Sequence, residues 1–155
     1  DEMGCRTVVL VHYKDQGLAK PNLEWEPSLT QIRKAHEYRA KKLGQHWLRI
    51  GTGDGTKFEC KPMFAVTFNG NVVPCPVCRD LSSGNIYQES LKDIFERGRD
   101  LLMFNFQVKG PCRECKNSDI CFGCRGTAFA NTGDVEASDP RCPWNPEAPE
   151  YFFPK

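Results

Sequence analysis

The 155-residue sequence carries almost no net charge, because 21 lysines and arginines against 20 acidic residues leave only +1. A chain this neutral has no bulk field that would attract nucleic acid or an anionic membrane surface. Long apolar runs are missing as well: the early run 8–11 has four residues, against the roughly 18 that a membrane span needs. We therefore expect neither a nucleic-acid partner nor a membrane partner.

A secretory signal is missing too. The sequence begins at Asp1, and its first methionine is Met3. No basic segment followed by an apolar stretch and a small-residue cleavage site opens the chain. We expect a cytoplasmic protein, and we expect this chain to be a fragment with further residues upstream.

Cysteine, in contrast, is abundant, with nine residues in the chain. Five lie within 112–142, and six form the CxxC pairs Cys75/Cys78, Cys112/Cys115 and Cys121/Cys124. An odd number cannot pair fully into disulfides. In a reducing compartment, close CxxC pairs are more often metal ligands or redox centres than crosslinks. A chain of this length can bury roughly 70% of its unfolded surface and does not need disulfides to fold.

The first fifty residues favour a strand, a helix and a second strand. Segment 6–13 is apolar and β-branched enough for a buried strand, and segment 46–50 resembles another strand. Between them, Ser28 can cap a helix with Gln31 as its capping-box partner, and Gly44 can end it. One βαβ unit implies a parallel sheet, whose two faces both need covering. We therefore assign residues 1–57 to the end of a larger α/β domain.

Residues 58–155 have a different pattern. Two short apolar runs flank Asn69-Gly70, a dipeptide that favours a type I′ hairpin turn. A helix is predicted over 90–104 with Ser90 as its cap, and a short one over 123–131. The cysteine-rich remainder has too few apolar residues for its own core, so we expect metal to organise it. The predicted class is α+β, a small cysteine-rich domain with a β-hairpin and short helices.

Spacing alone leaves two metals open. Zinc takes four thiolates in a closed tetrahedron, and paired CxxC motifs supply them. Iron–sulfur clusters also take four cysteine thiolates, but these bind different irons of a larger body, so one ligand can come from far along the chain. The lone Cys5 is interpreted as a small buried hydrophobic residue. His12, His36 and His46 are interpreted as structural.

The order of the cysteines resembles a known family. Cys60, nine residues, Gly70, four residues and Cys75 are followed by CxxC at Cys112, five residues and Cys121, with Cys142 last. This arrangement resembles the SPASM domain, the C-terminal cluster-binding extension of many radical S-adenosylmethionine (SAM) enzymes. The segments GNIYQESLKDIF and CRGTAFANTGDVEASDPRCPW are similar to the subgroup of haem d1 and alternative haem synthesis enzymes. By position, residues 1–57 then resemble the end of such an enzyme's partial barrel.

The resemblance implies two auxiliary [4Fe–4S] clusters and assigns seven ligands. The first cluster would take Cys60, Cys75 and Cys124, and the second would take Cys112, Cys115, Cys121 and Cys142. The sequence departs from the family in placing two residues, not three, between Cys121 and Cys124. It also has no cysteine in 51–59, where the family often supplies a further ligand. Cys78 is the nearest replacement, the alternatives being a free thiol near the cluster or an open iron site.

The implied function is the C-terminal part of a radical SAM/SPASM oxidoreductase. Its clusters would transfer electrons or position a peptide or small-molecule substrate such as a tetrapyrrole precursor, with a redox protein as partner. The CxxxCxxC motif that binds the SAM-cleaving cluster is absent from this sequence, so SAM and a third cluster would belong to an upstream domain. No catalytic side chain is predicted in this chain. A free-standing iron–sulfur electron-transfer protein and a zinc-held interaction module are the alternatives.

Overall fold

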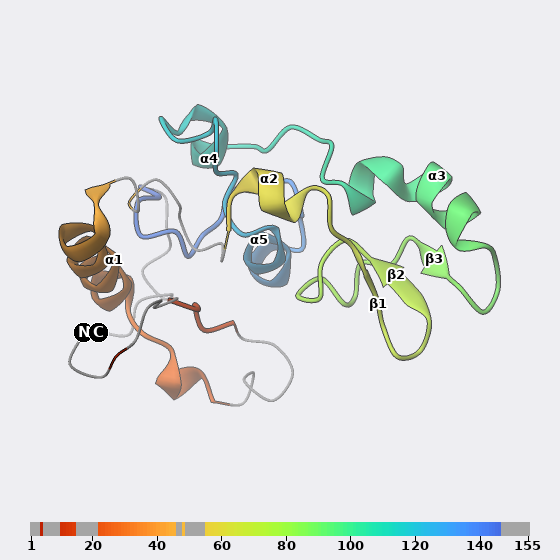
Figure 1. The fold of residues 1–155 in the computed structure, drawn as a ribbon, viewed down its shortest axis with the longest axis horizontal. Helices are drawn as coiled ribbons and strands as arrows, with labels where there is room; N and C mark the ends of the chain where they lie inside the picture. Colours follow the sequence, from red (N-terminus) through yellow and green to blue (C-terminus); the bar gives the residue numbers. More distant parts are fainter. Residues whose placement is uncertain (1–3, 5–9, 15–21, 46–47, 49–54, 147–155) are drawn as a thin grey trace.

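The computed structural model describes residues 4, 10–14, 22–45, 48 and 55–146. Helix α1 (Leu29–Leu43) lies at one end of the molecule, and a small sheet with helix α3 (Leu91–Leu102) lies at the other (Figure 1). Between them lie three short helices, α2 (Lys57–Cys60), α4 (Pro111–Glu114) and α5 (Arg125–Thr132). Most of the cysteines lie in this middle region.

Helix α1 begins and ends where the sequence predicts. The Ser28 hydroxyl accepts the Gln31 N–H at 3.2 Å, and the Gln31 side chain accepts the Ser28 N–H at 2.7 Å, which completes a capping box. Gly44 ends the helix with φ +120°. The buried side chains are Leu29, Ile32, His36 and Ala40, at the three- to four-residue spacing of one helical face. A short 3₁₀ turn, Leu23–Trp25, precedes the helix.

The strands expected on either side of α1 are not found in the described residues. Residues 10–13 have no strand conformation, and residues 6–9, 46–47 and 49–50 lie outside the described part. The βαβ unit, and the barrel end that it implied, therefore stay predictions. Within the described part no helix is long and apolar enough to cross a membrane.

The sheet has three short antiparallel strands in the order β1 (Ala65–Val66), β2 (Asn71–Val73), β3 (Gly84–Asn85). Ala65 pairs with Val73 and Val66 with Val72, which confirms the predicted hairpin. On the other edge of β2, Val72 pairs with Gly84. Together with the helices, this sheet makes the described part of the chain mixed α+β.

The hairpin turn differs from the type I′ prediction. That turn needs positive φ at both central residues, yet Phe104 is the one described non-glycine residue with positive φ. Gly70 alone takes the left-handed conformation, at φ +85°, and its N–H bonds to the Thr67 carbonyl at 2.9 Å. The loop is thus one residue longer, with the left-handed position at its end, and Thr67 and Asn71 close it through the Thr67 N–H and the Asn71 carbonyl at 2.9 Å.

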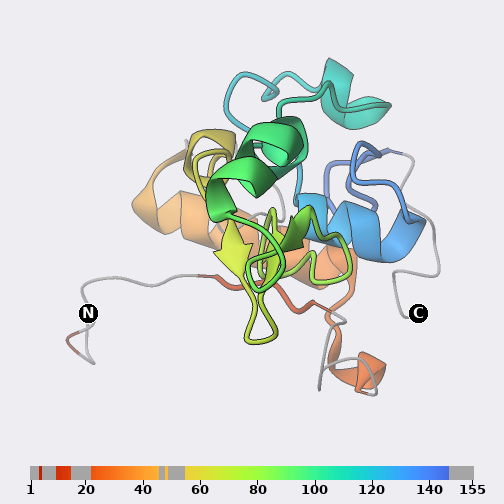
Figure 2. The ribbon, with the colours of Figure 1, turned by 90° about the vertical axis from the view of Figure 1, so that its right-hand side faces the viewer.

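Helix α3 covers one face of the sheet (Figure 2). Ser90 caps it, as predicted, by accepting the Asp93 N–H at 3.2 Å. Its buried residues Ile94 and Leu102 pack on Val72, and the rings of Phe64 and Phe95 lie beside them. The chain then leaves the helix through Phe104, whose φ of +48° turns it toward the cysteine-bearing loops.

Candidate metal centre

Eight cysteines lie in the described part of the chain, and none of them is in a disulfide. Several sit where a short helix meets a loop. Cys60 is the last residue of α2, Cys115 caps the C-terminus of α4, and Cys124 caps the N-terminus of α5. The helix ends therefore fix the positions of thiols from three separate stretches of chain.

A first cavity of about 480 Å³ has Cys60, Cys75 and Cys124 in its wall. Phe104 and Phe122 contribute aromatic rings to the same wall. Cys60 and Cys75 also pack on the hydrophobic cluster that these two rings form with Val108. Three thiols from distant positions in the sequence thus face one largely apolar space.

Cys78 adjoins this cavity but, among the described residues, is not part of its wall. It is 1% exposed, and its Sγ lies 3.7 Å from where a Cβ on Gly126 would stand, beside the first turn of α5. Its thiol donates a hydrogen bond to Cys75, which lowers the pKa of Cys75 to about 6. The same bond, followed by burial, raises the pKa of Cys78.

A second cavity of about 470 Å³ is lined by Cys112, Cys115 and Cys142, with Trp144 at its edge. Cys121 lies close to this group. Together with Cys112 it lines an adjoining cavity of about 270 Å³, and its charge acts on Cys142. Four further thiols therefore line the second cavity or the one that adjoins it.

Backbone amides bond to four of the sulfurs at N···S distances of 3.4–3.5 Å. The pairs are Val77 with Cys75, Asn117 with Cys115, Gly123 with Cys121, and Asp139 with Cys112. An N–H directed at sulfur favours the thiolate over the thiol. Around iron–sulfur clusters such bonds also help to set the reduction potential.

The carboxylate of Asp139 is fully buried and joins the two groups of cysteines. Its Oδ2 accepts the N–H of Cys124 at 2.8 Å, and its Oδ1 accepts the N–H of Arg141 at 3.0 Å. Its own N–H bonds to Cys112 Sγ. Asp139 therefore bonds to the backbone of a cysteine in the first cavity and to the sulfur of a cysteine in the second.

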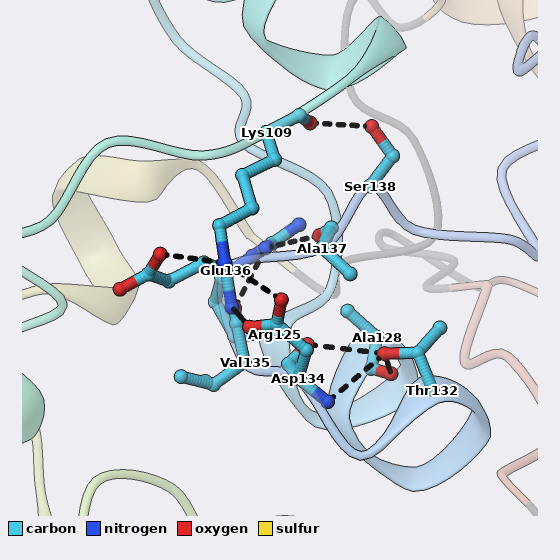
Figure 3. A network of polar contacts seen from close by, with 9 residues as sticks. All are labelled: Lys109, Arg125, Ala128, Thr132, Asp134, Val135, Glu136, Ala137 and Ser138. Carbon is cyan, nitrogen blue, oxygen red and sulfur yellow. Dashed lines mark hydrogen bonds and ion pairs between the residues drawn. The ribbon is translucent and has the colours of Figure 1, made fainter.

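Arg125 is one of two buried arginines in this region, the other being Arg141, and each has 3% of its surface exposed. Arg125 Nη1 donates to the carbonyls of Val135 at 2.9 Å and Ala137 at 2.7 Å, so the guanidinium holds the loop after α5 (Figure 3). The same figure shows Lys109, which bonds to the carboxylates of Asp134 and Glu136 at 2.8 and 3.0 Å. These contacts connect the segment before Cys112 to the loop before Cys142.

Further hydrogen bonds, from Cys112 and from Lys57, connect the loops of this region. The backbone N–H of Cys112 donates to the Ser138 hydroxyl at 2.8 Å, and that hydroxyl donates to the Lys109 carbonyl at 2.7 Å. From α2, Lys57 bonds through its N–H to Ile120 O and through Nζ to Ser118 O. The loop that carries Cys115 and Cys121 is thereby held against the helix that ends at Cys60.

Burial raises the pKa of several of these thiols. It does so for Cys112, for Cys124 and for Cys142, whose pKa rises to about 12. The nearby Asp139 carboxylate acts in the same direction on Cys124 and Cys142. Bare thiolates are therefore disfavoured here, and bonding to a metal cation is the interaction that would offset this cost.

Residues 58–125 match the family model named SPASM, an iron–sulfur cluster-binding domain. The chain carries a SPASM domain. This match confirms the resemblance that the order of the cysteines indicated.

The SPASM segment is also similar to named proteins. The chain is 38% identical over 88 residues to the PqqA peptide cyclase of Methylocella silvestris, covering 53% of this chain and 24% of that protein. It is 34% identical over 112 residues to the AdoMet-dependent heme synthase of Methanosarcina barkeri, covering 71% and 30%. The heme synthase of Nitratidesulfovibrio vulgaris is 29% identical over 83 residues, covering 52% and 22%. The chain therefore spans less than a third of the length of these relatives.

The side chains of this SPASM domain fit iron–sulfur clusters in their chemistry. Apart from the Met63 thioether, the sulfurs that line the two main cavities belong to cysteines, and four of the eight described cysteine sulfurs already accept backbone N–H groups. No group of three or more His, Cys, Asp or Glu side chains in the described residues is close enough to hold a single metal ion. The sulfurs instead surround two spaces of several hundred cubic ångströms.

Two residues of this site were missed by the sequence analysis, Arg125 and Asp139. Both are charged, and no spacing rule marks them as buried. The signal that was available is weak: each lies within three residues of a cysteine. Cys5 and His46, interpreted earlier as structural, lie outside the described residues, whereas His12 and His36 bond to each other at 2.7 Å.

Proposed function

We propose that this chain is the C-terminal part of a radical SAM/SPASM enzyme and that its two groups of cysteines bind two auxiliary [4Fe–4S] clusters. The observation that carries the proposal is the division of the thiols between two cavities within a segment that matches an iron–sulfur domain. Cys60, Cys75 and Cys124 would hold the first cluster. Cys112, Cys115, Cys121 and Cys142 would hold the second.

When bound, such clusters supply one-electron transfer at potentials that the surrounding protein sets. The chain's own residues have three tasks. The cysteines bind iron, the amides of Val77, Asn117, Gly123 and Asp139 stabilise the sulfurs, and the rings of Phe104 and Phe122 limit the access of water to the first cavity. Asp139 fixes the spacing of the two groups through its bonds to Cys124 and Cys112.

Cys78 is proposed as the fourth ligand of the first cluster. Its hydrogen bond to Cys75 and its electrostatic interaction with Cys124 place it next to two of the three assigned thiols. A thiolate also suits iron–sulfur chemistry better than the carboxylates of Asp54 or Glu59 would. Cys78 is buried, so its thiolate, and not a water molecule, would occupy the fourth coordination position of the first cluster.

The whole enzyme is proposed from the relatives. Their names describe a peptide cyclase and AdoMet-dependent heme synthases. We infer a peptide or tetrapyrrole-type substrate, and a redox protein that exchanges electrons with the clusters. The SAM-cleaving cluster would lie in residues upstream of this chain, since the chain spans 30% or less of each relative.

Iron analysis tests the proposal. Protein purified or reconstituted without oxygen should be brown and hold about eight irons per chain, as two cubanes require. A colourless protein with two zinc ions and no iron would instead support a zinc-held module. A brown protein whose gene has no upstream CxxxCxxC would support a free-standing electron-transfer protein.

The ligand assignment of Cys78 has its own test. Cys78→Ser should convert the first cluster to a three-iron form or shift its reduction potential, which electron paramagnetic resonance detects. Arg79→Gln is the control, because it changes an exposed neighbour and leaves every thiol in place. An unchanged spectrum and potential in Cys78→Ser would show that Cys78 is not a ligand.

A further inference from the structure

Arg125 has more hydrogen-bonding capacity than the protein uses. Its Nη1 is satisfied by the carbonyls of Val135 and Ala137, but its Nε and Nη2 are buried without a hydrogen-bond partner in the described structure. Leaving a buried charged donor unpaired costs more than leaving a neutral one unpaired. Two orphan donors on one cation that is 3% exposed point to an acceptor that the described residues do not provide.

The position of the guanidinium indicates what that acceptor is. A Cβ built on Gly123 would lie 2.8 Å from Arg125 Nη2 and 3.2 Å from Cys112 Sγ, so the donor and this sulfur border the same small space. Arg125 also interacts electrostatically with Cys124 and with Cys121. Cys124 belongs to the first cavity, whereas Cys112 and Cys121 belong to the second group. Arg125 therefore lies between the two.

Gly123 preserves this arrangement. Its φ is +72°, a conformation that favours glycine, and a Cβ there would also come within 2.6 Å of Asp139. The ring of Phe122 lies under the guanidinium at 5.4 Å and contributes a cation–π contact. The backbone and the ring thus hold the guanidinium in place on two sides.

We propose that Arg125 is a cation shared by the two iron–sulfur clusters, with Nε and Nη2 donating hydrogen bonds to cluster or thiolate sulfur and with its charge raising both reduction potentials. The inference rests on the proposed function. Reduction adds negative charge to a cluster, and a fixed buried cation stabilises the more negative state. Asp139 opposes this charge, but its two oxygens are engaged by the N–H groups of Cys124 and Arg141. Arg125 is thus a positioning and tuning residue, not a catalytic one.

Arg125→Gln tests the proposal, because glutamine keeps an amide donor but removes the charge. Iron content is measured first, and the two potentials are then followed by redox titration under electron paramagnetic resonance. We expect two clusters with both potentials lowered, each reduction equilibrium shifting about tenfold, which is about 59 mV for a one-electron couple. Arg79→Gln, the same charge change at an exposed site beside Cys78, should shift the potentials much less because solvent screens it.

The outcomes separate this proposal from the proposed function. Wild-type protein without iron overturns the proposed function, and the role of Arg125 with it. Iron-loaded Arg125→Gln with both potentials unchanged, or with only one changed, overturns the shared role alone. If Arg125→Gln does not hold iron, Arg125→Lys is titrated instead. Lysine keeps the charge but loses the Nε and Nη2 donors, so we expect at least one potential to fall, and two wild-type potentials would overturn the proposed hydrogen bonds from Nε and Nη2.

Discussion

The two ends of the SPASM segment are stabilised by different forces. The sheet and α3 bury Val72, Ile94 and Leu102 completely, and this part resembles the core of any small α+β protein. The loops after Phe104 bury instead a carboxylate and two guanidinium groups, with half-buried cysteines around a few aromatic rings. A hydrophobic core is stable by itself, whereas a region built on buried charges and thiols depends on each partner being present.

The sheet with α3 and the cysteine loops should therefore depend on metal to different degrees. Apolar burial in the sheet and α3 does not change when iron is removed. The cysteine loops would lose the bonds that offset the desolvation of their thiolates. Two predictions test that difference, and a third concerns helix α1; they run from the largest expected effect to the smallest.

Cys115→Ala should lose the iron of one cluster, about half of the total, and local structure over residues 110–142. Hydrogen exchange should show lost protection there, with α3 and β2 still protected. Lys116→Ala, an exposed neighbouring change, serves as the control and should keep all its iron. Full iron content and an unchanged melting curve in Cys115→Ala would rule out Cys115 as a ligand.

Ile94→Ala acts on the other region. It removes a completely buried side chain between α3 and the sheet, so the free energy of unfolding should fall by about 2–5 kcal/mol. Iron content should stay at the wild-type value in folded protein. Leu91→Ala, at a position 43% exposed on the same helix, should have a much smaller effect in denaturant titration. Loss of iron from folded Ile94→Ala would show that the two regions are not independent.

The smallest expected effect concerns pH and the buried histidine of α1. Burial, followed by the charge of Arg39, lowers the pKa of His36 from 6.5 to about 4. Arg39 Nη2 lies 3.0 Å from His36 Nδ1, and guanidinium only donates, so Nδ1 accepts. Neutral His36 must then donate from Nε2 to His12. Protonation of Nδ1 would break the bond from Arg39.

Because the pKa is lower in the folded protein, His36 stabilises the fold fully above about pH 6.5 and loses this contribution as the pH falls toward 4. The window is set by the two pKa values, 6.5 in the unfolded chain and about 4 in the folded protein. Denaturant titrations at several pH values should show a shallower loss in His36→Gln than in wild type. Parallel pH profiles for the two proteins would show that His36 does not titrate in this window.

Local sequence signals predicted the elements that depend on local interactions. The caps Ser28 and Ser90 each bond within three residues, so the starts of α1 and α3 were predictable. Strand β3, two residues long, was not predicted, because it forms by pairing with β2 and has no periodicity of its own. The turn was assigned to the wrong type because the Asn69-Gly70 signal does not show which of the two residues takes positive φ.

The candidate site was predictable only in part. The order of the cysteines indicated the family, and the family model confirms it. The binding of iron by each named thiol stays a prediction. Arg125 and Asp139 could not be found from the sequence, since their burial depends on partners 10 to 27 residues away. Long-range contacts of this kind leave no periodic pattern in a single sequence.

Along the chain, the cysteines of the two cavities alternate. Cys60 and Cys75 line the first and Cys112 and Cys115 the second, after which Cys124 returns to the first and Cys142 to the second. Any continuous stretch that contains every cysteine of one cavity therefore contains part of the other. Neither cavity can be duplicated, excised or transferred to another protein as a separate module. The smallest continuous segment that could be transferred with a complete cavity therefore carries cysteines of both cavities.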